Sequence, residues 1–108
     1  KTVELEGNSW KAFEIDSFQL NSTSILKFHA NILESVEINA ICLDENRSHQ
    51  KNKKKRCFAF GGTTDVSNSN QWYTLDYIQV GDDNTYEVPV GSYYQEEIKY
   101  IVLITKNT

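Results

Sequence analysis

The 108-residue sequence has little of what membrane spans and helical folds require. It contains no methionine, one proline, two cysteines and two histidines. No apolar run is long enough to cross a bilayer, and the first residues do not resemble a signal peptide. No segment shows the sustained 3.6-residue period of an amphipathic helix. We therefore expect neither membrane insertion nor a helical fold.

The residue constellations of common enzymes are missing as well. His29 has no acid beside it in the sequence, and neither cysteine lies in a nucleophile motif. No Cys/His spacing is typical of zinc, and Gly61-Gly62 alone does not make a phosphate loop. We therefore expect a protein that is not an enzyme.

Short strands separated by turn residues account for most of the chain. Aromatic residues make up 12% of the sequence, and such side chains pack well on pleated sheets. Residues 23–32 alternate between apolar and polar side chains, as a half-buried strand does. We predict an all-β fold, an antiparallel β-sandwich of jelly-roll type, in a single domain over residues 1–108. The predicted strands are 23–32, 36–44, 56–60, 72–80, 85–90 and 98–105, with a short helical turn within 91–97.

Two of these strands have a predictable place in the sheet. Residues 98–105 are apolar on both faces, which favours a central position. Pro89 cannot donate to a sheet ladder, so it favours an edge strand or a strand end. Residues 36–44 begin with alternation and then become apolar on both sides, which indicates a bulge or deeper burial.

The chain reads as a piece of a longer, extracellular protein. It starts at Lys1 and has no methionine, so we expect it to be processed or excised. Asn21 and Asn46 each begin a glycosylation sequon. A pair of cysteines in a small domain suits the same compartment. We therefore expect secretion.

The two cysteines bracket a long loop. In a hairpin between 36–44 and 56–60, the register that pairs Leu43 with Arg56 sets Cys42 opposite Cys57. Opposed Cβ atoms lie roughly 4.5–5.5 Å apart, close to what a disulfide needs. We predict a Cys42–Cys57 disulfide; two free buried thiols are the alternative.

The bracketed loop is strongly basic although the chain carries a net charge of −4. Residues 47–56 hold six of the eleven basic residues and no acid. A solvated loop without a partner, a nuclear-import signal and an anion site are the three interpretations. An anion site would have an acidic polysaccharide as its ligand. Nucleic acid is not expected as a partner, because no aromatic residues are interleaved with the basic residues. The candidate ligand-binding residues of the anion site are Arg47, Lys53, Lys54 and Lys55.

The polar stretch 63–76 holds the better candidates for a ligand site. Adjacent Trp72 and Tyr73 follow a run of Thr, Ser, Asn and Asp residues. A flat ring beside hydrogen-bonding groups is what a sugar face requires. We expect one ring of the pair to stack on a sugar and the other to lie in the core, with Asn70 and Asp76 binding sugar hydroxyls.

Two acidic turns raise the question of calcium. Residues 44–46 and 82–84 each cluster carboxylate and amide oxygens, which are ligands that calcium prefers. Neither turn matches an EF-hand loop, and ordinary solvated turns are the alternative. The sequence thus leaves a structural calcium open and predicts no other cofactor.

Six fragments in order resemble the jelly-roll modules appended to secreted polysaccharide-degrading enzymes, such as agarases and related algal-polysaccharide hydrolases and lyases. The resemblance covers nearly the whole chain, and its most specific part is Pro89-Val90-Gly91 followed by paired aromatics. It implies a non-catalytic, lectin-like carbohydrate-binding module that holds a parent protein on polysaccharide. The fragments are "LEGNSWKAFEI" (5–15), "AICLDEN" (40–46), "RCFAFGGT" (56–63), "NQWYTLD" (70–76), "TYEVPVGSYY" (85–94) and "KYIVLIT" (99–105).

The chain departs from that family pattern in two places. The basic loop between the cysteines replaces a short acidic one, and the pattern continues past "LITKN" (103–107) into one more strand. A sandwich without that strand would have an open edge, which favours pairing with a second copy. The alternative function is therefore a structural or adhesion domain that mediates protein contact or forms a homodimer through a sheet edge.

Overall fold

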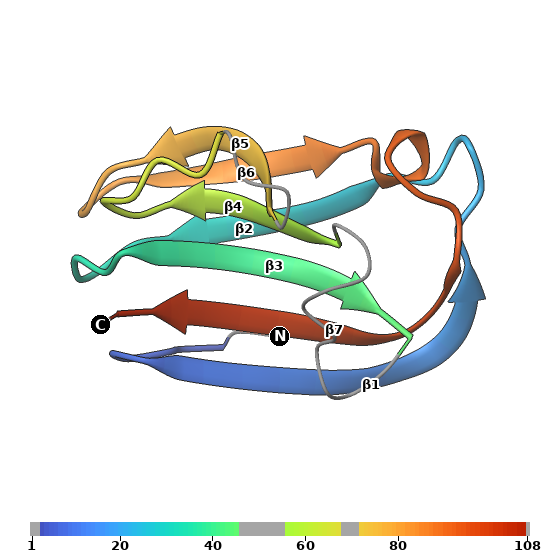
Figure 1. Ribbon diagram of the computed structural model, residues 1–108, viewed down its shortest axis with the longest axis horizontal. Coiled ribbons are helices and arrows are strands. Elements are labelled where there is room, and N and C mark those ends of the chain that lie inside the picture. Colours follow the sequence, from blue (N-terminus) through green and yellow to red (C-terminus); the bar gives the residue numbers. More distant parts are fainter. Residues whose placement is uncertain (1–2, 46–55, 68–71, 108) are drawn as a thin grey trace.

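Strands make up most of a computed structural model of the chain, which describes residues 3–45, 56–67 and 72–107. Figure 1 shows them in two packed layers. The described elements are β1 (Ser9–Gln19), β2 (Leu26–Asn31), β3 (Ile38–Asp44), β4 (Cys57–Gly61), β5 (Trp72–Ile78), β6 (Asp83–Val88), the 3-10 turn η1 (Val90–Ser92) and β7 (Glu97–Lys106).

The strands form a five-stranded sheet and a two-stranded sheet. The larger sheet has the order β1-β7-β3-β4-β5, and the smaller one pairs β2 with β6. The predicted all-β sandwich is confirmed. The ladders are antiparallel except that β4 and β5 run parallel, because the connection after β4 returns the chain to the end at which β4 began. The jelly-roll topology stays a prediction.

Most predicted strands occur close to their predicted positions. β7 lies between β1 and β3, so the prediction of a central C-terminal strand is confirmed. β6 ends at Val88, directly before Pro89, and η1 provides the expected helical turn slightly earlier than predicted. All of β3 is buried, and its register with β4 shifts between Asn39 and Ala40, so the deeper burial and the bulge both occur.

The alternation of apolar and polar residues did not predict strand β1. It is an edge strand, and most of its residues are exposed or half-buried. Its register with β7 also shifts between Glu14 and Phe18. An exposed strand with a bulge keeps little of the apolar alternation by which strands are recognised.

The core has two parts, one on each face of the larger sheet. The inner part lies between the sheets and includes Ile41 and Phe58 of the larger sheet with Tyr86 of the smaller one. The outer part lies on the opposite face and includes Ala40 and Trp72. Both faces of β3 and β4 are therefore buried, which explains the apolar runs 40–43 and 57–60.

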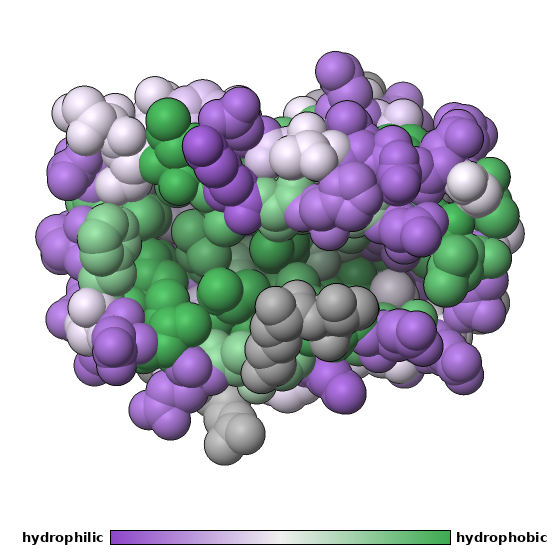
Figure 2. Space-filling view, turned by 180° about the vertical axis from the view of Figure 1, so that it is seen from behind, coloured by the Kyte–Doolittle hydropathy of each residue, from purple (hydrophilic) through white to green (hydrophobic). Residues whose placement is uncertain are grey.

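The smaller sheet is too narrow to cover the inner face of the larger one. Neighbouring strands lie about 4.8 Å apart, so two strands face less than half the width of five. Figure 2, seen from behind, shows a hollow with apolar surface between polar rims. Ile15, Ile101 and Leu103 pack against the inner core but are only half-buried.

The β3–β4 hairpin is closed by the predicted disulfide. Cys42 pairs with Cys57 in the register of the two strands, and their sulfur atoms are bonded. Both residues are fully buried, so the prediction of a disulfide is confirmed and that of free thiols is wrong. A disulfide in a small domain is compatible with an extracellular location.

Next to the disulfide, Arg56 forms a buried network of ion pairs. Its guanidinium lies 2.6 Å from Asp44 Oδ1 and 3.3 Å from Glu45 Oε1, and it also contacts Glu96. Burial alone would lower the pKa of Arg56, but attraction to Asp44 and Glu96 outweighs this and raises it. Asp44 is fully buried, so its charge depends on this partner.

Tyr94 connects this network to the backbone. Its hydroxyl donates toward the carbonyl oxygens of Leu43 and Arg56, at 3.3 and 3.0 Å. Burial raises the pKa of Tyr94 well above its usual range, so the hydroxyl stays a donor. The base of the hairpin is thus held by a covalent bond, charges and hydrogen bonds together.

Candidate functional site

An open, shallow cavity of about 360 Å³ lies between the segment after β4 and strand β5. β5 creates it by a bulge: Ala59 pairs with Thr74 and Gly61 with Ile78, so four steps along β5 match two along β4. Residues 74–77 of this bulged stretch line the cavity. The lining residues are Gly62, Thr63, Thr64, Asp65, Thr74, Leu75, Asp76 and Tyr77.

The segment 62–65 is held in place by backbone contacts with the residues before β3. The Thr63 and Thr64 amides donate to the carbonyl oxygens of Val36 and Glu37, at 3.0 and 3.1 Å. Gly62 has φ of +125°, and a Cβ atom there would lie 2.1 Å from the Glu37 oxygen. Only glycine therefore fits at the start of this wall.

Replacing Gly62 with alanine should lower the free energy of unfolding by about 2 kcal/mol, because the new methyl group displaces backbone and the φ angle is strained. Urea unfolding would measure this loss. Gly81→Ala is the matched control, since Gly81 also has positive φ but nothing lies within 4 Å of its added Cβ. Equal losses for the two variants would contradict the steric argument.

Asp65 and Tyr77 fix the geometry of the cavity wall. Asp65 Oδ1 accepts from the Ser67 amide at 2.9 Å, and this hydrogen bond lowers the pKa of Asp65. The Tyr77 hydroxyl donates to the Thr64 carbonyl oxygen at 3.1 Å. Burial and the charge of Asp65 raise the pKa of Tyr77, so its hydroxyl remains protonated. The cavity thus has an ionised carboxylate beside a positioned ring.

The lining suits a ligand with many hydroxyl groups. Asp65 and Asp76 accept hydrogen bonds, and three threonine hydroxyls both donate and accept. Tyr77 is half-buried and contributes an aromatic wall. No lysine or arginine lines the cavity among the described residues. Its charge is therefore negative, which favours neutral ligands over anionic ones.

Trp72 and Tyr73 point to opposite faces, as predicted, and Trp72 is the buried one. Trp72 is 7% exposed and packs in the outer core, so its ring has no face left for a sugar. Tyr73 is half-buried, stacks on Phe58 at 5.2 Å and meets the exposed ring of Tyr93 edge-on at 4.6 Å. A stacking role within the predicted pair can therefore belong only to Tyr73.

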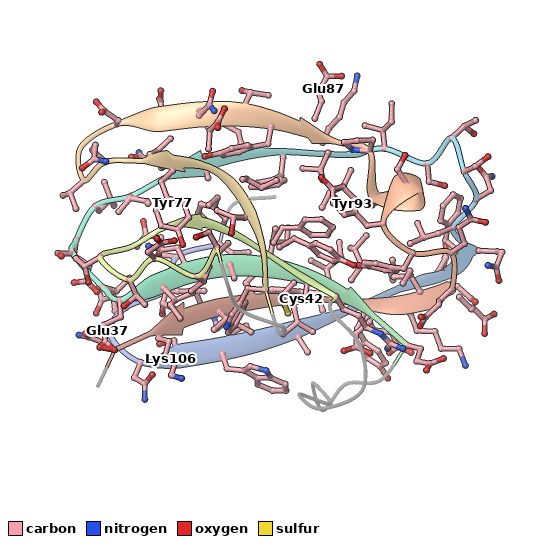
Figure 3. All side chains as sticks on the ribbon, turned by 45° about the horizontal axis from the view of Figure 1, so that its top comes forward. Glu37, Cys42, Tyr77, Glu87, Tyr93 and Lys106 are labelled. Atoms are coloured by element: carbon pink, nitrogen blue, oxygen red, sulfur yellow. A yellow bond between two sulfur atoms is a disulfide. The ribbon has the colours of Figure 1, made fainter. Side chains whose placement is uncertain are left out.

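The structure separates Tyr73 from Asp76. Tyr73 lies beside Tyr93 at the start of β5, whereas Asp76 lines the cavity near the end of β5. Figure 3 shows Tyr77 and Tyr93 in different parts of the molecule. Asn70 and the basic candidates Arg47, Lys53, Lys54 and Lys55 lie outside the described residues.

No pattern in the sequence singles out Tyr77, Asp65 or the threonines that complete the cavity. The lining residues all lie within or beside the polar stretch 63–76. A strand without a bulge would place Tyr77 on the same face as Tyr73, away from Asp76. The bulge has no clear signal in the sequence, so the missed residues could not be assigned to one face.

Of the residues considered for calcium, three contact a basic side chain, and Asn46 lies outside the described residues. Asp44 and Glu45 contact Arg56, and Asp83 lies 3.5 Å from His29 Nε2 across the smaller sheet. His29 therefore does have an acid nearby, on the neighbouring strand. Within the described residues, no group of three or more His, Cys, Asp or Glu side chains is arranged to hold a metal ion.

Among the residues that the structure describes, no helix is long and apolar enough to span a membrane. Comparisons of the chain with protein-family models, with curated proteins and with solved structures found no match. The cavity at the β5 bulge is the candidate ligand site.

Proposed function

We propose that this chain is a secreted, non-catalytic carbohydrate-binding module that attaches a parent enzyme or surface protein to polysaccharide. The observation that carries the proposal is the β5 cavity, where carboxylates, hydroxyls and an aromatic wall meet. This combination binds sugar hydroxyls in a directed way while the ring excludes water from one side. The resemblance to modules of algal-polysaccharide enzymes supports the same class of ligand.

The direct test is affinity electrophoresis in gels that contain agarose, κ-carrageenan or alginate, which are neutral, sulfated and uronic polysaccharides. Neutral agarose should retard the protein most, because Asp65 and Asp76 repel anionic chains. No retardation in any gel would overturn the proposal. Retardation by carrageenan or alginate that weakens with salt would instead assign the contact to the basic residues 47–56.

Replacing Asp76 with alanine should weaken agarose binding about tenfold, because a hydrogen bond to a charged group is lost. The side chain of Asp76 is exposed, so the midpoint of thermal unfolding should not change. Asp16→Ala is the matched control, since Asp16 is an exposed aspartate on β1, at the opposite edge of the larger sheet. Equal retardation of both variants and the wild type would exclude Asp76 from the site.

A second candidate function is a protein-contact domain that pairs with a second copy. The half-buried apolar face and the edge position of β1 in the sheet of the described residues support it. Light scattering after size-exclusion chromatography separates the two functions. A tight dimer without retardation by polysaccharide would favour this candidate, and a monomer at high concentration would exclude it.

A further inference from the structure

A second, smaller cavity adjoins the β5 cavity. Its volume is about 230 Å³, and Gly62 and Thr63 line both cavities. The segment that follows β4 therefore forms a wall of both cavities. The remaining lining residues of the second cavity are Ile32, Glu34, Ser35, Val36, Asn39, Ile78, Gln79 and Val80.

Asn39, on β3, brings an unsatisfied hydrogen-bond donor to this second cavity. Asn39 is 7% exposed, and its Nδ2 atom has no hydrogen-bond partner among the described residues. Buried donors are nearly always paired, because an unpaired one loses its hydrogen bonds to water without replacement. An acceptor oxygen from a ligand in the cavity would satisfy it.

The rest of the second cavity combines apolar and polar walls. Ile32 and Ile78 give it apolar surface, while Glu34 adds a carboxylate. Glu34 Oε1 accepts from the Gly7 amide at 2.8 Å, which holds this side chain in place. A cavity with apolar walls and a few fixed polar groups is typical of a ligand subsite.

We propose that the second cavity is a subsite for a further sugar unit, so that the ligand is a glycan of at least two units lying across Gly62 and Thr63. The first unit occupies the β5 cavity, and an oxygen of the next unit accepts a hydrogen bond from Asn39 Nδ2. This inference rests on the proposed function and adds to it the length of the ligand and a specificity-determining residue.

Binding of galactose and of agaro-oligosaccharides of increasing length, measured by isothermal titration calorimetry, tests the proposal. Oligosaccharides should bind more tightly than galactose. Asn39→Val should reduce their affinity about threefold to tenfold, the effect of losing one neutral hydrogen bond, and leave galactose binding unchanged. If agarose fails but another polysaccharide retards the protein, its own monosaccharide and oligosaccharides take their place.

Thr105→Val is a closely matched control. Thr105 faces Asn39 across the β3–β7 ladder, is buried, and has a hydroxyl without a partner among the described residues, but it does not line the cavity. Both variants remove an unpaired buried polar group, so neither should lower the midpoint of thermal unfolding. Only Asn39→Val should weaken oligosaccharide binding.

The outcomes separate this inference from the proposed function. Absence of binding to every polysaccharide overturns both. Binding that does not increase from monosaccharide to oligosaccharide overturns the second subsite and leaves the β5 cavity as the site. If Asn39→Val does not fold, the length dependence of the wild-type protein decides alone.

Discussion

Replacing Arg56 with methionine should lower the free energy of unfolding by about 3–5 kcal/mol, the cost of breaking a buried ion pair from one side. The guanidinium contacts three carboxylates, and fully buried Asp44 would lose the partner that compensates its charge. Methionine retains much of the side-chain volume, so loss of packing contributes less than loss of charge. Urea unfolding followed by tryptophan fluorescence would measure the difference.

An exposed ion pair provides the control for Arg56. Lys99 lies 3.9 Å from Glu97, and both side chains are about half exposed. Lys99→Met should therefore change stability by less than about 1 kcal/mol. If Arg56→Met also costs less than about 1 kcal/mol, the network does not stabilise the hairpin base as argued.

Removing the disulfide with the double variant Cys42→Ala, Cys57→Ala should cost about 3 kcal/mol. The two cysteines are 15 residues apart, and the loss of cross-linking lets the unfolded chain gain loop entropy. Much of the effect thus arises in the unfolded state, and native contacts next to the bond should change little. Thermal unfolding of the wild type and the variant would measure the loss.

A reductant supplies the internal control for this prediction. It should lower the stability of the wild type toward that of the double variant and leave the variant unchanged. Free-thiol counting in denaturant before and after reduction verifies the starting state. Equal stability of oxidised and reduced wild type would contradict a stabilising role for the bond.

The sequence predicted those parts of the fold that follow from local alternation. The Cys42–Cys57 bond follows from hairpin register, because opposed positions in a ladder are set by counting from the turn. Residues 98–105 were placed centrally because they are apolar on both faces. Strand β1 gave no such signal, since an edge strand keeps polar residues on both sides.

The sequence indicated the region of the candidate site but not the full set of residues that line it. The polar stretch 63–76 contains or borders the cavity wall, yet the faces of its residues depend on a bulge and on a parallel pairing. Both are results of tertiary packing and not of local pattern. Trp72 illustrates the limit. Alternation predicts that Trp72 and Tyr73 lie on opposite faces of the strand, but it does not decide which of the two side chains is buried in the core.

The position of β7 also determines when the protein can fold. β7 joins β1 to β3, so the larger sheet lacks its middle until residues 97–106 have been synthesised. β2 likewise waits for β6, more than fifty residues later in the chain. Contacts of such high contact order close slowly. The domain should therefore fold late and as one unit, after its last strand has left the ribosome.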